Sequence, residues 1–271
     1  MSESAVPRSL PWPDRAPVLG VDQFRDVIAR LSSLAMRHPE RVVLLGAGVD
    51  AEGDGELAGD PPPALEQIVE ELGGVEVDGT ARLDLLVDER ADVGPYTLLG
   101  DATTYYPLYE GEDVAIVLTL DEDGAPGAVL GIGDDLAMTL VALDLRSFLE
   151  RWADALEATV ESLTADTGNE GSGTDPEAAE ALMGSHLLRE ALGDVPERTT
   201  VRVTAPSELE DAEDLDLPAG TVAVADLRGA ALGTVVELMD APLPGGGADI
   251  LDLHVAFTAD GLVIALVGDA A

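Results

Sequence analysis

The spacing of apolar residues predicts three amphipathic helices in the first part of the chain. In residues 22–38, 61–72 and 144–163 apolar side chains recur every three or four positions, as on one face of a helix. Asp22 and Asp144 precede the first and third of these repeats as N-cap residues. The pattern therefore predicts two long helices with a shorter one between them.

After Gly73-Gly74 the apolar period changes from helical to strand-like. The glycine pair predicts the end of the second helix, because glycine readily takes the left-handed conformation at a helix C-terminus. Short apolar or alternating runs follow, separated by turns rich in glycine, proline and aspartate. One such run, at 41–49, precedes the second helix. The runs that follow the glycine pair in the first part are 75–77, 83–87, 96–99, 114–120, 128–132 and 136–143. Strands this closely spaced indicate a largely antiparallel sheet with flanking helices, so the predicted fold class is α+β.

Composition divides the chain into four segments. Residues 1–20 are proline-rich and predict an extended tail, and 21–163 form the first α+β domain. Residues 164–175 have the polar, glycine-rich composition of a linker. Residues 176–271 predict a smaller α+β unit, with one helix followed by strands. Its strand candidates are 199–203, 221–225, 234–238, 250–257 and 262–267, with an acidic loop at 207–217 and a hairpin turn at 259–261.

The net charge limits the partners that the chain can bind. Among its 271 residues 54 are acidic and 14 are basic, which gives a formal charge of −40, and every basic residue is arginine. This charge repels nucleic acids and anionic membranes and attracts basic proteins. An alternative is that the acidity serves solubility in a salt-adapted or high-GC organism. The apolar residues never form an uninterrupted run of 18, and the acidic start does not resemble a signal peptide, so we expect a cytoplasmic protein.

The residue types that perform catalysis do not form a known motif. The chain has no cysteine, and His38, His186 and His254 lie in three separate predicted elements. Asp121 and Asp123 resemble the start of a calcium loop, but the twelfth position is Ile132 where a glutamate is required. We therefore expect neither a metal, a cofactor nor an enzyme.

Two segments are candidates for contact with a protein partner. The first combines Tyr105, Tyr106 and Tyr109 with the acidic residues Glu110, Glu112 and Asp113. Tyrosines beside acids are typical of protein interfaces, although these tyrosines could instead pack on the sheet. The second is the acidic hairpin turn with Asp121, Glu122 and Asp123.

Residues 61–163 combine four features in a fixed order. They are a short helix ending in Gly-Gly, the Tyr-x-Leu-Leu-Gly element at 96–100, paired strands around the acidic turn, and a last strand leading into a helix that starts Asp144-Leu145-Arg146-Ser147-Phe148. In these features the segment resembles the SMI1/KNR4, or SUKH, superfamily. The aromatic residues that often follow the Gly-Gly in the family are absent. The resemblance implies an α+β domain without catalytic residues, similar to bacterial immunity proteins that neutralise toxins, often nucleases.

The sequence thus leaves three hypotheses in order of preference. The first is an acidic, non-catalytic module that binds a basic protein such as a toxin domain. The second is a structural or assembly adaptor that self-associates, using the C-terminal unit. The third is an enzyme that depends on carboxylates or a bound metal.

Overall fold

The computed structural model describes residues 16–45, 62–79, 81–85, 104–110, 114–133, 135–166, 199–209, 211–243, 250 and 253–268. Within these ranges no helix is long and apolar enough to cross a membrane. Helices and strands are mixed and most strand pairs are antiparallel, which confirms the α+β fold class.

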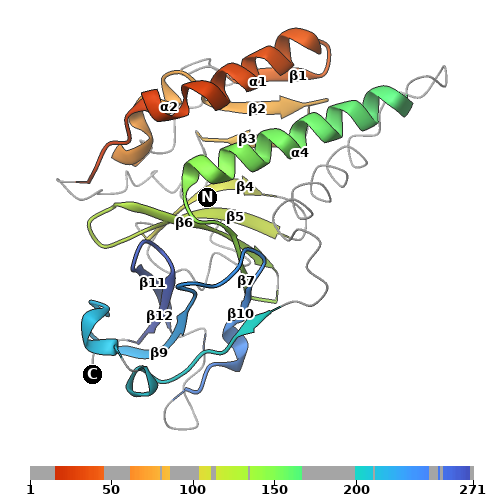
Figure 1. Ribbon diagram of the computed structural model, residues 1–271. Helices are drawn as coiled ribbons and strands as arrows, with labels where there is room; N and C mark the ends of the chain where they lie inside the picture. Colours follow the sequence, from red (N-terminus) through yellow and green to blue (C-terminus); the bar gives the residue numbers. More distant parts are fainter. Residues whose placement is uncertain are drawn as a thin grey trace, which may run out of the picture.

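The helices lie on one side of the molecule. The 3-10 turn η1 (Val21–Phe24) leads into α1 (Arg25–Arg37), and η2 (Pro63–Leu65) leads into α2 (Glu66–Val69). The long helix α4 (Leu145–Asp166) runs beside α1 (Figure 1). Three single turns, η3 (Pro206–Glu208), η4 (Ala212–Asp214) and η5 (Leu238–Asp240), belong to the C-terminal part.

The strands in the described ranges form three sheets. A small antiparallel sheet has the order β1 (Val42–Leu45), β2 (Gly74–Val77), β3 (Ala81–Asp84). The central sheet has the order β4 (Tyr105–Glu110), β5 (Val114–Leu120), β6 (Pro126–Gly133), β7 (Ala137–Ala142), β10 (Val235–Glu237), β8 (Thr200–Val201). The C-terminal sheet has the order β11 (His254–Thr258), β12 (Val263–Val267), β9 (Thr221–Asp226).

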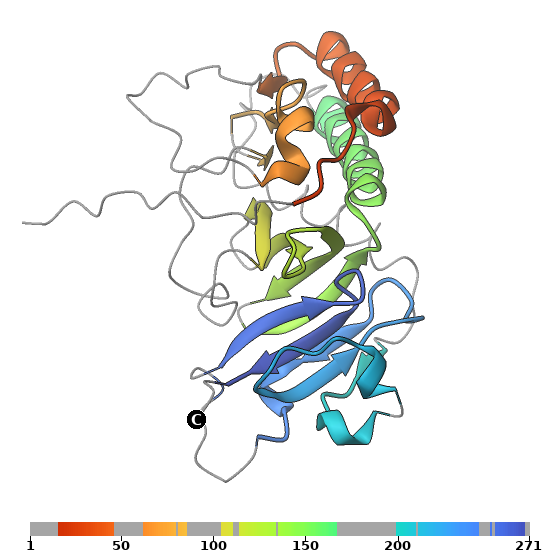
Figure 2. The same cartoon turned by 90° about the vertical axis from the view of Figure 1, so that its left-hand side faces the viewer.

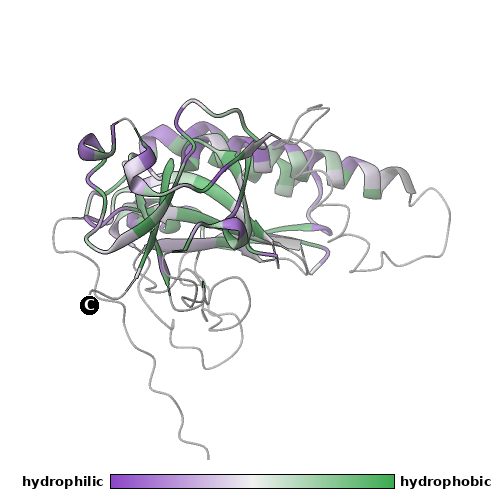
Figure 3. Ribbon diagram, turned by 90° about the horizontal axis from the view of Figure 1, so that it is seen from below, coloured by the Kyte–Doolittle hydropathy of each residue, from purple (hydrophilic) through white to green (hydrophobic). Residues whose placement is uncertain are grey.

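Both faces of the central sheet are covered by apolar layers. One core cluster joins α1, α2, α4 and the small sheet to side chains such as Ile116 and Leu118 of β5. A second cluster joins the opposite face, with Val117 and Leu130, to the C-terminal sheet. Figure 2 shows the resulting order of helices, central sheet and C-terminal sheet. Figure 3 shows that apolar residues gather on the strands and on one side of the helices.

The two predicted α+β units share one sheet. Strand β10 pairs antiparallel with β7, and β8 pairs parallel with β10, so strands from the C-terminal part complete the central sheet. The predicted linker begins inside a helix, because α4 continues through Thr164 to Asp166, and its remaining residues lie outside the described ranges. The helix predicted to follow it also lies outside them.

Helix ends agree with the sequence at one predicted cap and differ at another. Asp144 accepts a hydrogen bond from the amide of Ser147 at 2.7 Å, as an N-cap should. Asp22 lies inside η1 instead of capping it, and its carboxylate accepts a hydrogen bond from Arg25 at 2.6 Å. The 3-10 turn that leads into α1 begins at Val21 with Gly20 at its N-cap position, two residues before the predicted cap.

The glycine pair after α2 does not act as predicted. Neither Gly73 nor Gly74 has a positive φ, and Gly74 already begins β2. Gly73 donates its amide to Leu45 O at 2.8 Å, while its carbonyl accepts from the Leu85 amide at 2.9 Å. The pair therefore extends the small sheet, because its backbone groups bond to neighbouring strands.

Candidate protein-binding surface

The three predicted contact tyrosines are buried in the two cores. Tyr105, Tyr106 and Tyr109 are each 5% exposed or less, so this part of the predicted surface is not available to a partner. Tyr105 packs in the cluster facing the C-terminal sheet, and the other two pack on the helical side. The Tyr106 hydroxyl donates to Leu85 O at 2.8 Å and fixes the ring beneath the small sheet.

The burial of these tyrosines follows from their place in β4. Successive strand residues point to opposite faces, and both faces of this sheet are covered. A register shift between Pro107 and Tyr109 turns Tyr109 to the same side as Tyr106. Glu110 ends β4, the structure does not describe its side chain, and Glu112 and Asp113 lie outside the described residues.

The acidic turn between β5 and β6 is held by hydrogen bonds and exposes Glu122 and Asp123 to solvent. We define it as residues Asp121 to Ala125. The Asp121 carboxylate accepts hydrogen bonds from the Asp123 amide at 3.0 Å and the Ala125 amide at 2.7 Å. The Gly124 amide donates to Asp121 O at 2.9 Å, and Gly124 takes a φ of 76°.

These bonds divide the three acidic residues of the turn into two roles. Asp121 holds the backbone, as aspartate does in an Asx turn. Glu122 and Asp123 are exposed, and no ion pair among the described residues reaches either of them. Both carboxylates are therefore free to meet a cation from a partner.

A second acidic segment lies along the outer edge of β9. This is the predicted acidic loop at 207–217, of which residues 207–209 and 211–217 are described; it overlaps η3, contains η4 and follows the bridge between Thr204 and Val224. Leu215 is buried beneath it, and Arg228 pairs with Asp211 at 2.8 Å and with Asp226 at 2.7 Å. The hydrogen bond from Arg228 lowers the pKa of Asp226 below its usual value.

The acidic loop exposes several carboxylates that these contacts do not use. They are Glu208, Glu213, Asp214 and Asp216. Residues 199–271 contain two arginines, Arg202 and Arg228, so few cations of the chain lie near in sequence. Composition alone marks this loop as acidic, but its order depends on one buried leucine and one arginine that composition does not single out.

Comparison of the chain with protein families, with curated proteins and with solved structures finds no match.

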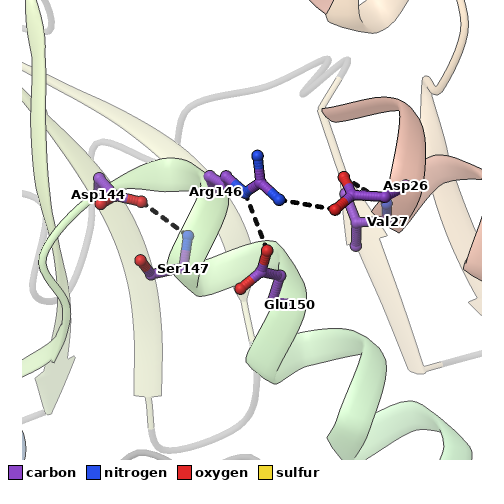
Figure 4. Close-up of polar contacts among 6 residues, drawn as sticks. All are labelled: Asp26, Val27, Asp144, Arg146, Ser147 and Glu150. Atoms are coloured by element: carbon purple, nitrogen blue, oxygen red, sulfur yellow. Dashed lines mark hydrogen bonds and ion pairs between the residues drawn. The ribbon is translucent and has the colours of Figure 1, made fainter. Parts of the chain in front are cut away.

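The α1–α4 seam differs from the acidic turn because the carboxylates that face it are paired. Arg146 joins α4 to α1 through Asp26 at 2.6 Å and also bonds Glu150 at 2.9 Å (Figure 4). Farther along the same seam Arg30 pairs with Asp154 and with Glu157. The hydrogen bond from Arg30 lowers the pKa of Glu157 below its usual value.

Arg37 adds a third contact between the two helices. It bonds Glu157 at 3.3 Å, so that one carboxylate meets two guanidinium groups. Among the described residues, exposed carboxylates without an ion pair therefore include those of the acidic turn and the acidic loop, whereas the carboxylates that face the α1–α4 seam are paired.

The described histidines do not join these acidic groups. His38 follows α1 and His254 begins β11, while His186 lies outside the described ranges. Within those ranges no group of three histidine, aspartate or glutamate side chains is placed to hold a metal ion. What the acidic turn and loop can do chemically is attract and bind cationic groups.

Proposed function

We propose that this protein is an acidic, non-catalytic binding module that neutralises a basic protein partner, as immunity proteins neutralise toxins such as nucleases. The observation that supports this proposal best is the uneven pairing of its charges. Arginines compensate the carboxylates on the α1–α4 seam, whereas no cation in the described part of the chain pairs with Glu122 or Asp123, which project from a hydrogen-bonded turn. Rigid, desolvatable carboxylates suit the recognition of lysine and arginine side chains.

The choice of partner follows from charge and from the likeness to the SUKH superfamily. A nuclease presents a basic groove to its nucleic acid, and an acidic protein competes for that groove. Association would be steered by the field of 40 net negative charges and would weaken as salt is added. We place this encounter in the cytoplasm.

The proposal is tested with a purified basic nuclease domain whose catalysis has been disabled, and with a lysine homopolymer as the probe of nonspecific attraction. Replacing Glu122→Gln together with Asp123→Asn should lower affinity for the nuclease domain about tenfold at low salt, equivalent to about 1.4 kcal/mol. The loss should lie mainly in the association rate and should shrink as salt rises.

A matched variant separates a local contact from the effect of total charge. The double variant Glu40→Gln/Glu161→Gln also removes two negative charges, but from exposed positions near α1 and on α4. Equal losses of affinity from both double variants would mean that net charge alone attracts the probe, and the proposed surface would then be wrong. Binding of the polymer should fall equally in both.

A further inference from the structure

The hairpin β11–β12 contacts the β5–β6 hairpin at the base of the acidic turn. The pairing of β5 with β6 shifts register between Leu118 and Leu120, so Thr119 of β5 lies opposite two residues of β6, Gly127 and Ala128, which form a bulge. At this bulge the Ala128 amide donates to Asp260 O at 2.8 Å. The Thr119 hydroxyl donates to Ala128 O, also at 2.8 Å. Figure 2 shows the two hairpins side by side.

The fit between the two hairpins is tight enough to require glycine on both sides. A Cβ atom at Gly127 would collide with Asp260 O, and one at Gly261 would collide with the Thr119 hydroxyl. The same Cβ at Gly261 would lie 2.7 Å from Ala128 N. The contacts with Asp260 O and Ala128 N involve backbone atoms, which cannot move aside as a long side chain can.

The docked turn also has an unusual backbone. Ala259, Asp260 and Gly261 have φ values of 50°, 57° and 77°, three left-handed residues in succession. Alanine and aspartate pay an energetic penalty in that region, so surrounding contacts must hold them there. The hydrogen bond from Ala128 and the closure from Leu262 N to Ala259 O at 3.1 Å provide such contacts.

We propose that the Ala259–Gly261 turn is a positioning device for the acidic turn. The bulge interrupts the ladder next to Asp121, and the docked turn supplies the hydrogen bond that the Ala128 amide would otherwise lack. The direction in which Glu122 and Asp123 project therefore depends on a segment more than a hundred residues later in the chain. The consequence for partner binding rests on the proposed function, whereas the positioning itself does not.

The test compares two glycines with nearly the same φ, 77° at Gly261 and 75° at Gly229. Gly261→Ala places a Cβ against Thr119 and Ala128, whereas Gly229→Ala has a φ of 75° and open space around it, so it costs backbone strain alone. Hydrogen exchange is measured on the amides of Asp121, Asp123, Gly124 and Ala125, each of which is bonded inside the turn. Gly261→Ala should speed their exchange about tenfold or more, and Gly229→Ala should leave it unchanged.

A second pair keeps the inference falsifiable where Gly261→Ala fails to fold. Thr119→Val removes the hydroxyl that bonds Ala128 O, and Thr119→Ser retains it. Faster exchange in the valine variant than in the serine variant supports positioning. Serine lacks the methyl group of threonine, so loss of that methyl group cannot explain a larger effect of valine. Unchanged exchange in the valine variant, or equal exchange in the two glycine variants, overturns it.

Binding of the nuclease domain separates this inference from the proposed function. Gly261→Ala keeps the net charge, so weaker binding in this variant reports the direction of the carboxylates. In that background the Glu122→Gln/Asp123→Asn change should cost less affinity than in the native chain. If exchange changes as expected but the native protein binds no basic partner, the positioning inference stands and the proposed function fails.

Discussion

At the scale of single residues, aspartates hold the backbone at several turns. Asp121 accepts two amides in the acidic turn, and Asp144 caps α4. Asp78 lies in the tight turn between β2 and β3, where it and Gly79 have φ values of 47° and 82°. Two positive φ values in succession are typical of the hairpin turns that match the twist of a sheet.

Asp78 also forms an ion pair that is shielded from solvent. Its carboxylate lies 2.8 Å from Arg41, and the two side chains are 15% and 11% exposed. Asp78→Ala should lower the free energy of unfolding by about 2–3 kcal/mol, because it removes this partner and places alanine in the left-handed region. Asp78→Asn tolerates that region and should cost clearly less. Urea denaturation measures both; equal costs would mean that backbone conformation does not contribute.

The tyrosines of β4 show where sequence reasoning at this scale fails. Three tyrosines followed by acids have the composition of an interface, and the same residues also suit a strand between two cores. Deciding between the two requires knowing that both faces of β4 are covered, and that cover comes from α4 and from β11, far away in sequence. No local pattern contains this information.

At the scale of elements, the pairing of α1 with α4 combines an apolar seam with ion pairs. Phe24, Leu31 and Trp152 are buried in one core cluster, and Arg30 and Arg146 join the two helices by ion pairs. Because the seam is partly exposed, each ion pair stabilises the fold only slightly. The stability that these ion pairs contribute nevertheless depends on pH in a definite direction.

Glu157 gives the measurable case. Its pKa is below the ordinary value of 4.5 in the folded protein, so the stability it contributes is complete above that value and is lost as pH falls through the folded pKa. Glu157→Gln should therefore cost about 0.5–1 kcal/mol near neutral pH, an amount limited by solvent screening, and the cost should vanish in acid. The control is Glu161→Gln on the same helix. A cost that stays constant from pH 7 to strongly acidic conditions would contradict this account.

The sequence predicted the positions of strands better than it predicted which strands pair with each other. The apolar runs in the C-terminal part correspond to β8 through β12, and the turn at 259–261 lies where the hairpin signal predicts it. The run at 114–120 coincides with β5. The pairing of β7 with β10 could not be predicted, because alternation shows that a strand has a buried face but does not identify its neighbour.

At the scale of the whole molecule, 40 net negative charges oppose compaction. Adding NaCl from about 0.05 M to about 0.5 M screens this repulsion, so the urea midpoint of unfolding should rise. The same salt weakens the α1–α4 ion pairs, but those are few. A midpoint that falls with salt would show that attraction within the seam outweighs repulsion across the molecule.

Truncation tests how far the two parts of the chain depend on each other. A chain that ends at Asp166 loses β8 to β12 and exposes the apolar face with Val117, Leu130 and Leu140. We expect it to bind the hydrophobic dye ANS and to lose the cooperative urea transition of the full chain. A sharp transition in the truncated chain would show that residues 1–166 fold alone.

The order β7-β10-β8 has a consequence for synthesis on the ribosome. When β7 leaves the exit tunnel, β10 has not yet been translated. The backbone amides and carbonyls on the β10 side of β7 therefore stay unpaired until Val235 to Glu237 are synthesised. Nascent chains therefore pass through a stage in which β7 is an unpaired edge strand and the apolar face of the central sheet is exposed. A stop codon or a translational pause between β7 and β10 leaves a partly folded chain that is prone to aggregation.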